Sequence, residues 1–300
     1  MAGDVVTHAA ALTDADGAAY LGRLGLEAEL PAVDALVRLH RAHVEQVPYE
    51  TTWIHMGERW GIDRLASLRR IAYDRRGGYC FHLNGAFSLL LDWLGYDVTL
   101  HVGGVHGPEG PTHESMANHL VLIVSGLATD ANLAGAWYVD TGLGDALHEP
   151  LPLVAGQHNQ GPFTFELAPS DGSIVDWQFR HHHLGSFPGM GFRAEPTSIE
   201  AFTARHGVLS TAPTSPFVTT MTAQRRDALG IDVLRGKVLR RVEQTITSET
   251  VLDDRSDWFS VLADVFGLAL DVDSGWRAAL WLSAGRTHQQ WLETQSARSP

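Results

Sequence analysis

The chain has 300 residues, 44% of them hydrophobic, and a formal net charge of −13 at pH 7. This length and apolar content suffice for a sizeable core and indicate two or three domains. The negative charge argues against a nucleic-acid partner, because phosphate binding requires a concentrated basic face. Cys80 is the sole cysteine, so an intramolecular disulfide and a cysteine-rich metal site are excluded, which is typical of a reducing compartment.

The same features set expectations for the location of the protein. The first residues contain no basic segment followed by an apolar run, so no secretory signal is expected. No stretch reaches the ~18 uninterrupted apolar residues that a membrane span needs. We therefore expect a cytoplasmic protein without a membrane partner. A homodimer is one option for its oligomeric state, which the sequence leaves open.

The first third of the chain has the apolar spacing of helices. Apolar residues recur every three or four positions over 14–24 and 30–47, and Pro48 ends the second of these predicted helices. A third helix is predicted to begin near Cys80 and to stop at Gly95. One face of this third helix carries Cys80, Asn84, Phe87, Leu91 and Leu94.

The centre of the chain changes to short β-branched and aromatic runs bounded by Gly, Pro, Asn and Asp. These runs predict strands at 97–102, 119–124 and 136–140, and strand-like pieces over 161–183. The order of elements is therefore helical, then β-rich, then mixed α/β, with no structure assigned beyond Gly275. The last part is predicted to contain a short helix at 199–206, strands at 217–224 and 233–246, and a helix at 257–266.

Cys80 follows a glycine pair at the predicted start of a helix. Backbone N–H groups at a helix start lower the pKa of a cysteine thiol, and neighbouring arginines such as Arg75 and Arg76 act in the same direction. A lone cysteine is nevertheless more often a small buried apolar residue. The thiol therefore needs partners before it can be assigned a catalytic role.

His119 and Asp140 are the candidate partners. A nucleophilic thiol needs a base within hydrogen-bond reach and a third group that orients this base. His119 opens an apolar strand, and Asp140 closes the next one, where a buried carboxylate is costly unless it is paired. Cys80, His119 and Asp140 thus form a candidate papain-like triad for acyl transfer. The alternative is that His119 and Asp140 are ordinary strand-end polar residues.

Several segments resemble, in the same order, motifs of the arylamine N-acetyltransferases. Arg76–Phe81 with Asn84 resembles the nucleophile motif, Asn118–Val124 the histidine strand, and Val139–Gly144 the aspartate motif. The resemblance extends over residues 15–270. It implies that Cys80, His119 and Asp140 correspond to the catalytic triad of the family. Further matching segments are Val47–Glu50, Ser215–Thr219 and Leu234–Gly236.

The resemblance implies an α+β fold in three parts around a papain-like Cys-His-Asp core. It implies a helical bundle over 1–95 that carries the nucleophile, and a β-barrel over 96–207 that carries the histidine and the aspartate. It also implies an α/β lid with the C-terminal tail over 208–300.

The resemblance further implies roles outside the triad. Tyr49, Leu143 and Phe217 correspond to the acceptor pocket, with plain core packing as the alternative. Arg76 and Glu50 would pair to support the glycine turn, with two separate surface charges as the alternative. The stretch that contacts CoA in the family corresponds to Ser115, Met116, Ala117 and Asn118.

The sequence departs from the family pattern beside the triad. His82 stands where the family usually has Glu, and we expect it to pack rather than to act as a second base. Tyr49, Thr51 and Leu143 also differ from the usual residues, which bears on acceptor choice. No metal site is predicted at the histidine run 181–183, because adjacent strand residues point to opposite faces.

The implied activity is the transfer of an acetyl or other short acyl group from acyl-CoA, through an acyl-cysteine, to an arylamine or arylhydrazine. Acetyl-CoA or another acyl-CoA would be a co-substrate in this ping-pong reaction, and no tightly bound cofactor is expected. The alternative is a biosynthetic acyltransferase or amide synthase that acylates a dedicated intermediate or closes a macrolactam, from a carrier-bound acyl thioester. A cysteine hydrolase or transglutaminase-like enzyme and a catalytically silent binding protein are further alternatives.

Overall fold

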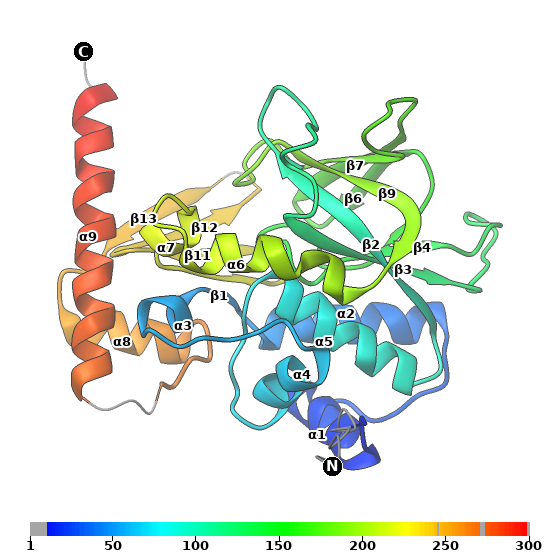
Figure 1. Ribbon diagram of the computed structural model, residues 1–300, viewed down its shortest axis with the longest axis horizontal. Helices are drawn as coiled ribbons and strands as arrows, with labels where there is room; N and C mark the ends of the chain where they lie inside the picture. The colour runs from blue at the N-terminus through cyan, green and yellow to red at the C-terminus, as the bar shows by residue number, and fades with distance from the viewer. Residues whose placement is uncertain (1–10, 245, 271–273, 299–300) are drawn as a thin grey trace, which may run out of the picture.

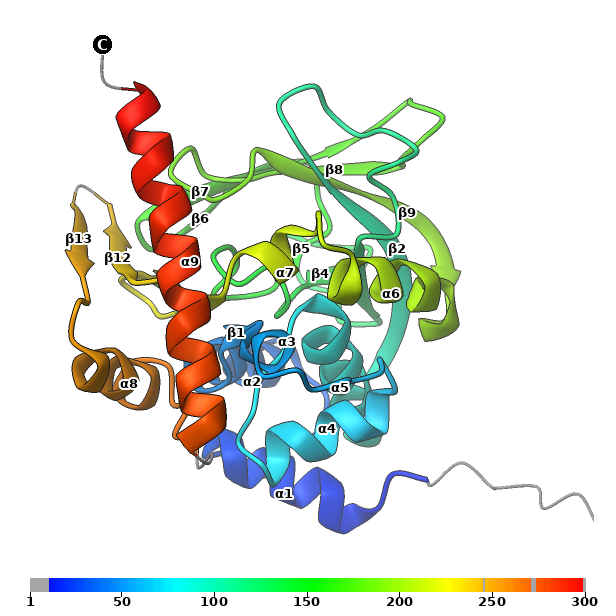
Figure 2. The same ribbon diagram turned by 60° about the vertical axis from the view of Figure 1, so that its left-hand side comes forward.

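The computed structural model describes residues 11–244, 246–270 and 274–298. The N-terminal helices lie on one side of a large curved sheet (Figure 1). A smaller sheet lies beside both, together with the last two helices, and Figure 2 shows the C-terminal helix running along the edge of the molecule. The structure is thus a mixed α+β fold, as the sequence predicted.

The N-terminal helices follow the predicted order, with two additions. The predicted helices are α1 (Asp14–Leu24), α2 (Val33–Gln46) and α5 (Cys80–Trp93). The additional helices are the single turn α3 (Thr52–His55) and α4 (Arg64–Ala72), which were not predicted. α4 begins where the side chain of its N-cap residue, Asp63, accepts a hydrogen bond from the Ala66 N–H at 2.7 Å.

The helix α5 is the central element of the helical part. Its side chains are buried on nearly every face between Cys80 and Leu91, because α4 covers it on one side and the strands β2 (Asp97–His106) and β3 (His119–Ser125) cover it on the other. A helix that is apolar all round is stable only when it is buried in this way. The N-terminus of α5, and with it Cys80, therefore lies inside the molecule.

Within the described residues, the larger sheet has eight strands in the order β5-β4-β3-β2-β9-β8-β7-β6, and all neighbours are antiparallel. It curves into a nearly closed barrel (Figure 1). The predicted strands at 97–102, 119–124 and 136–140 are confirmed as β2, β3 and β4 (Trp137–Val139). The others are β5 (Leu151–Pro152), β6 (Gly156–Gln160), β7 (Phe163–Pro169), β8 (Trp177–Arg180) and β9 (Gly189–Thr197).

The smaller sheet has five strands in the described ranges, in the order β1-β10-β11-β12-β13. Its first strand, β1 (Tyr49–Glu50), comes from the helical part of the chain, and Tyr49 pairs with Gln224 across 175 positions of sequence. The other strands are β10 (Thr222–Arg226), β11 (Gly230–Arg235), β12 (Val238–Glu243) and β13 (Thr247–Val251).

Two strands that the sequence predicted in the last part of the chain are wrong, because neither range forms one continuous strand. Residues 217–224 do not form one strand, because Ser215 caps a short helix, α7 (Pro216–Thr219), and β10 begins only at Thr222. The predicted strand at 233–246 is split between the end of β11 and β12, because Gly236, with a φ of 58°, turns the chain between them. Thr245 of this range lies outside the described residues.

The helices after residue 198 differ in their bounds from the predicted ones. The predicted helix at 199–206 is a 3₁₀ turn (Ile199–Phe202) followed by α6 (Thr203–Thr211), and the one at 257–266 is α8 (Arg255–Asp264). The unassigned tail forms α9 (Ser274–Arg298). None of the helices in the described ranges combines the length and the apolar character that crossing a membrane requires.

Candidate active site

A cavity of about 410 Å³ contains Cys80 and His119 in its wall. It lies where the helical part, the barrel and the smaller sheet meet. Tyr49, Leu143 and Phe217 also line it, so the structure brings all three candidate acceptor-pocket residues to the same cavity as the cysteine and the histidine.

The glycine pair before Cys80 allows the chain to approach β1 closely. A Cβ atom on Gly77 would lie 1.9 Å from the carbonyl oxygen of Pro48, and Gly78 has a φ of 147° that favours glycine. The N–H of Glu50 donates to the carbonyl oxygen of Gly78 at 2.9 Å. This turn fixes the start of α5, where Cys80 is 3% exposed.

His119 and Asp140 form a buried pair. The Nε2 atom of His119 lies 2.7 Å from Oδ2 of Asp140, and the hydroxyl of Tyr138 donates to the same oxygen at 2.7 Å. Burial by itself lowers the pKa of His119, but the charges of Asp140 and Cys80 and their hydrogen bonds raise it to about 10. For Asp140 burial acts in the opposite direction and raises the pKa. The charge and the hydrogen bond of His119 outweigh this effect and hold the pKa of Asp140 below its usual value.

Asn84 is a site residue to which sequence reasoning gave no role of its own. Its Nδ2 donates to Oδ1 of Asp140 at 2.8 Å and to the carbonyl oxygen of Leu120 at 2.6 Å. Its Oδ1 accepts from the N–H and the hydroxyl of Thr141 at 2.8 and 2.9 Å. The available signal was a polar side chain on the apolar face of α5, because a buried amide needs partners.

The stretch 115–118 reaches the cavity through its last residue. Asn118 lines the cavity, and its carbonyl oxygen lies 3.7 Å from Sγ of Cys80. Its side chain is bound to the backbone of Val105, whose N–H and carbonyl oxygen it contacts at 2.8 and 2.9 Å. The hydroxyl of Ser115 instead donates to the Thr112 carbonyl in the exposed loop, and Met116 lines a separate cavity.

Arg76 and Glu50 form an ion pair, with 3.1 Å between Nη2 and Oε1, so the alternative of two separate surface charges is wrong. The side chain of Glu50 is fully buried. It accepts from the N–H of Thr52 at 2.8 Å and also from the Thr52 hydroxyl. The pair connects β1 to the turn before Cys80.

His82 is fully buried in an aromatic cluster. Its ring centre lies 4.8 Å from that of Tyr79, 5.4 Å from that of Trp53 and 5.7 Å from that of Trp60. Its Nδ1 atom accepts a hydrogen bond from the N–H of Tyr79 at 3.4 Å. A Glu at the third position of a helix makes this same contact in a capping box, so His82 acts as the capping residue of α5 in this chain.

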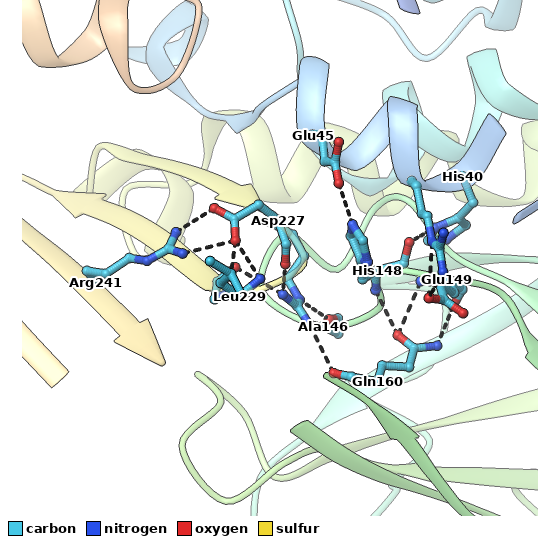
Figure 3. A network of polar contacts seen from close by, with 12 residues as sticks. His40, Glu45, Ala146, His148, Glu149, Gln160, Asp227, Leu229 and Arg241 are labelled. Atoms are coloured by element: carbon cyan, nitrogen blue, oxygen red, sulfur yellow. Dashed lines mark hydrogen bonds and ion pairs between the residues drawn. The ribbon is translucent and has the colours of Figure 1, made fainter. Parts of the chain in front are cut away.

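The loop that follows β4 is held by a buried polar network (Figure 3). Nδ1 of His40 lies 3.0 Å from the carbonyl oxygen of His148, and Nε2 of His148 lies 2.6 Å from Oε1 of Glu45. Gln160 accepts from the N–H of His148 at 2.9 Å and donates to the carbonyl of Glu149 at 2.7 Å. The loop is thereby attached to α2 and β6.

Arg226 of β10 holds the same loop from the other side. Its Nε donates to the carbonyl of Ala146 at 3.1 Å, and other N–H groups reach the carbonyls of Gly230 and Gln160 at 3.0 and 3.4 Å. The guanidinium lies 4.5 Å from the ring centre of Phe163. Burial lowers the pKa of Arg226 to about 10, against the effect of nearby carboxylates.

Among the residues that the structure describes, no three His, Cys, Asp or Glu side chains gather closely enough to hold a metal ion. In the histidine run 181–183, Nε2 of His181 lies 3.5 Å from Asp145, and the ring of His182 packs on Phe163.

Comparison with known proteins places this chain in a class. A family model described as N-acetyltransferase matches residues 32–274. The pineal-gland isozyme of arylamine N-acetyltransferase from Gallus gallus is 30% identical over 244 residues, which cover 75% of this chain and 82% of the relative. The chain therefore belongs to the arylamine N-acetyltransferase family and is an acyltransferase.

Other relatives agree with this assignment. The Salmonella typhimurium arylamine N-acetyltransferase / N-hydroxyarylamine O-acetyltransferase is 34% identical over 166 residues, which cover 55% of this chain and 57% of that protein. The Mycobacterium marinum arylamine N-acetyltransferase, solved in complex with CoA, has a TM-score of 0.78 and 25% identity, with 90% of this chain and 98% of that chain covered. The predicted fold class is confirmed.

Proposed function

We propose that the protein transfers an acetyl or other short acyl group from acyl-CoA to the amine of an arylamine or arylhydrazine, through a thioester on Cys80. The observation that carries this proposal is the buried His119–Asp140 pair, which lies in one site with Cys80. The names of the relatives support the acceptor class. The CoA complex of the M. marinum enzyme supports CoA as the acyl carrier.

In the first half-reaction, Cys80 acts as the nucleophile. Nε2 of His119 is bound to Asp140, which leaves Nδ1 to face the thiol. A pKa of about 10 keeps the imidazole protonated at neutral pH, so its charge stabilises a thiolate. The thiolate attacks the thioester carbonyl, and the N–H of Cys80 at the helix start stabilises the oxyanion. The bond to the CoA sulfur breaks, and His119 gives its proton to the departing thiol.

In the second half-reaction, the amine attacks the acyl-cysteine carbonyl. His119, now neutral, takes the proton of the amine as general base, and the amide leaves as the thiolate is restored. Asp140 orients the imidazole throughout and stabilises its charged form. The two half-reactions share one site, which predicts ping-pong kinetics.

We assign the acceptor pocket to Tyr49, Leu143 and Phe217. The rings of Tyr49 and Phe217 are 6.5 Å apart at an angle of 64°, an edge arrangement that leaves apolar surface for an aromatic acceptor. We assign CoA contacts to residues 115–118, supported by the position of Asn118 in the cavity wall, and structural support of the site to the Arg76–Glu50 pair. A cytoplasmic location and a homodimer stay predictions.

The test is intact-mass measurement after mixing with acetyl-, propionyl- and malonyl-CoA, followed by a panel of arylamines and hydrazines. We expect the mass of one acyl group to appear and then to disappear when a suitable amine is added. Cys80→Ala should take up no acyl group. An adduct that persists in this variant, or a wild-type protein that none of the three donors acylates, would contradict the proposal.

A second candidate is the biosynthetic acyltransferase or amide synthase, which would use a larger acceptor or a carrier-bound thioester. It is favoured by Leu143 in place of a phenylalanine and by a second chamber of about 410 Å³ that adjoins the cavity. Acylation of Cys80 by acetyl-CoA followed by no transfer to any small amine would support this candidate over the first.

A further inference from the structure

The cavity that contains Cys80 continues into a second chamber of about 410 Å³. Ser186, Thr220 and Arg235 line both chambers and therefore mark the junction between them. The second chamber lies between the smaller sheet and α9, which contributes Thr287. A ligand at Cys80 can therefore extend past the junction without crossing a packed core.

The floor of both chambers is one face of the smaller sheet. Tyr49 of β1 pairs with Gln224 of β10, and Thr222 of β10 pairs with Arg235 of β11. Directly paired residues share a face in an antiparallel sheet, and all four of these side chains line the first chamber. Leu234 has the opposite orientation and packs in the core with α8. Arg235 therefore projects from the same face as the acceptor-pocket residue Tyr49.

Arg235 differs from the other charged residues of the two chambers because it has no partner of opposite charge. Arg240 on the same floor lies 3.8 Å from Glu249, and Asp145 in the wall lies 3.5 Å from Nε2 of His181. In the parts of the chain that the structure describes, no carboxylate lies within ion-pair distance of Arg235. The chain carries a formal charge of −13, so an exposed, unpaired cation in the wall of the nucleophile's cavity is a local exception to the overall field.

The charge of Arg235 acts on the cavity of the nucleophile. Burial raises the pKa of Tyr49, and the guanidinium of Arg235 opposes this rise. Tyr49 and Cys80 lie in the wall of the same chamber. A substrate group bound at Arg235 would therefore belong to a molecule whose other end can reach the thiol.

We propose that Arg235 recognises an anionic group, a carboxylate or a phosphate, on a substrate whose reacting end lies at Cys80. A guanidinium binds both groups through two parallel N–H donors. The anion belongs either to the acceptor amine, as in an aminobenzoate, or to the phosphates of CoA. The inference rests on the proposed function, because it requires a substrate that reacts at Cys80.

The test compares Arg235→Met with wild type on matched substrates. One pair of donors is acetyl-CoA and the acetyl thioester of N-acetylcysteamine, which carries no phosphate. One pair of acceptors is 4-aminobenzoate and 4-toluidine, which has no carboxylate. Loss of a charge-assisted hydrogen-bonded pair should lower kcat/KM about 10- to 100-fold for the anionic member of one pair, and leave its neutral counterpart unchanged. Arg225→Met, on the opposite face of β10, is the matched control and should behave as wild type.

The substrate pair that shows the loss identifies the molecule that carries the anion. A loss confined to acetyl-CoA assigns the phosphate, and a loss confined to 4-aminobenzoate assigns the carboxylate. Equal losses on charged and neutral substrates, or no loss on any, would overturn the inference. Intact-mass acylation of Arg235→Met by the neutral thioester shows that the variant is folded and reactive. Failure of wild type to acylate with either thioester would instead count against the proposed function.

Discussion

Asn84 donates a hydrogen bond at 2.8 Å to the carboxylate of Asp140, and this contact joins the helix that begins with Cys80 to the strand β4 that precedes the aspartate. The same amide accepts two hydrogen bonds from Thr141 and donates one to Leu120. One side chain on α5 therefore sets the position of the aspartate motif relative to the nucleophile.

Replacing Asn84 tests this connection. Asn84→Ala removes one of two hydrogen bonds to Oδ1 of Asp140, which keeps the one from the N–H of Gly142 at 3.0 Å. It also leaves the buried N–H and hydroxyl of Thr141 without their acceptor, so it should lower the free energy of unfolding by about 2–4 kcal/mol. Ser88→Ala, one turn later on α5, removes a hydrogen bond to the Gly85 carbonyl and a longer one, at 3.3 Å, from Arg64, and should cost about 1 kcal/mol. Urea denaturation measures both. Equal effects of the two changes would show that Asn84 has no special position.

The orienting role of Asp140 predicts a large kinetic effect without a large change in shape. Asp140→Asn should slow acylation of Cys80 about 10³- to 10⁴-fold, because the amide no longer stabilises the charged imidazole. Tyr138→Phe removes one hydrogen bond at 2.7 Å from the same carboxylate and should slow acylation much less. Rapid-quench intact-mass measurement gives both rates. An Asp140→Asn variant that acylates at the wild-type rate would exclude the orienting role.

Gly142 lies against the nucleophile. A Cβ atom at this position would approach Cα of Cys80 to 2.7 Å and its Cβ to 3.0 Å. Gly142→Ala should therefore displace Cys80 and reduce both acylation and thermal stability. Gly22→Ala on α1 is the control, because nothing lies within 4 Å of the added methyl and alanine favours a helix by about 0.5–1 kcal/mol. Thermal melts should move in opposite directions for the two variants.

The Arg76–Glu50 pair predicts a non-additive effect. Arg76→Met leaves the fully buried carboxylate of Glu50 without its cation, which should cost about 3–5 kcal/mol. Adding Glu50→Gln removes the uncompensated charge, so the double variant should recover part of this loss. Urea denaturation of both single variants and the double variant measures the coupling. Additive losses would indicate that the two groups stabilise the turn independently.

The pKa of His119 predicts a loss of stability at alkaline pH. The folded-state pKa is about 10, above the ordinary value of 6.5, so the folded chain binds more protons between these two values. The protonated His119 therefore contributes fully to the free energy of unfolding below pH 6.5, and this contribution is lost as the pH rises through 10. His119→Gln should remove this contribution. The difference in stability between wild type and variant should shrink between pH 6 and pH 10, and a constant difference would contradict the assignment.

The triad candidates could be found from the sequence because each stands where the local pattern changes. Cys80 follows a glycine pair at a helix start, and His119 and Asp140 stand at strand ends. The partners of Asn84 could not be found, because they come from distant segments, and the same holds for Trp53 and Trp60, which pack against His82. A polar residue on an apolar helix shows that a partner exists and gives no indication of which one.

The elements that the sequence did not predict, or predicted wrongly, can each be explained by a local feature of the sequence. β1 has two residues, too few for any periodicity to appear. Residues 216–219 read as a strand because they include Phe, Val and Thr, and the Ser215 cap with a following proline overrides this preference. α9 carries Trp276, Trp281 and Leu292 without a single apolar stripe, so the helical period is weak.

The pairing of Tyr49 with Gln224 also affects how the enzyme is made. Residues 49–50 leave the ribosome long before the strand that they join, and contacts of such long sequence separation form late in folding. The part of the cavity wall that this pair forms is therefore completed only after most of the polypeptide has been synthesised. A nascent chain that ends before β10 carries the cysteine but lacks the surface against which an acceptor would bind.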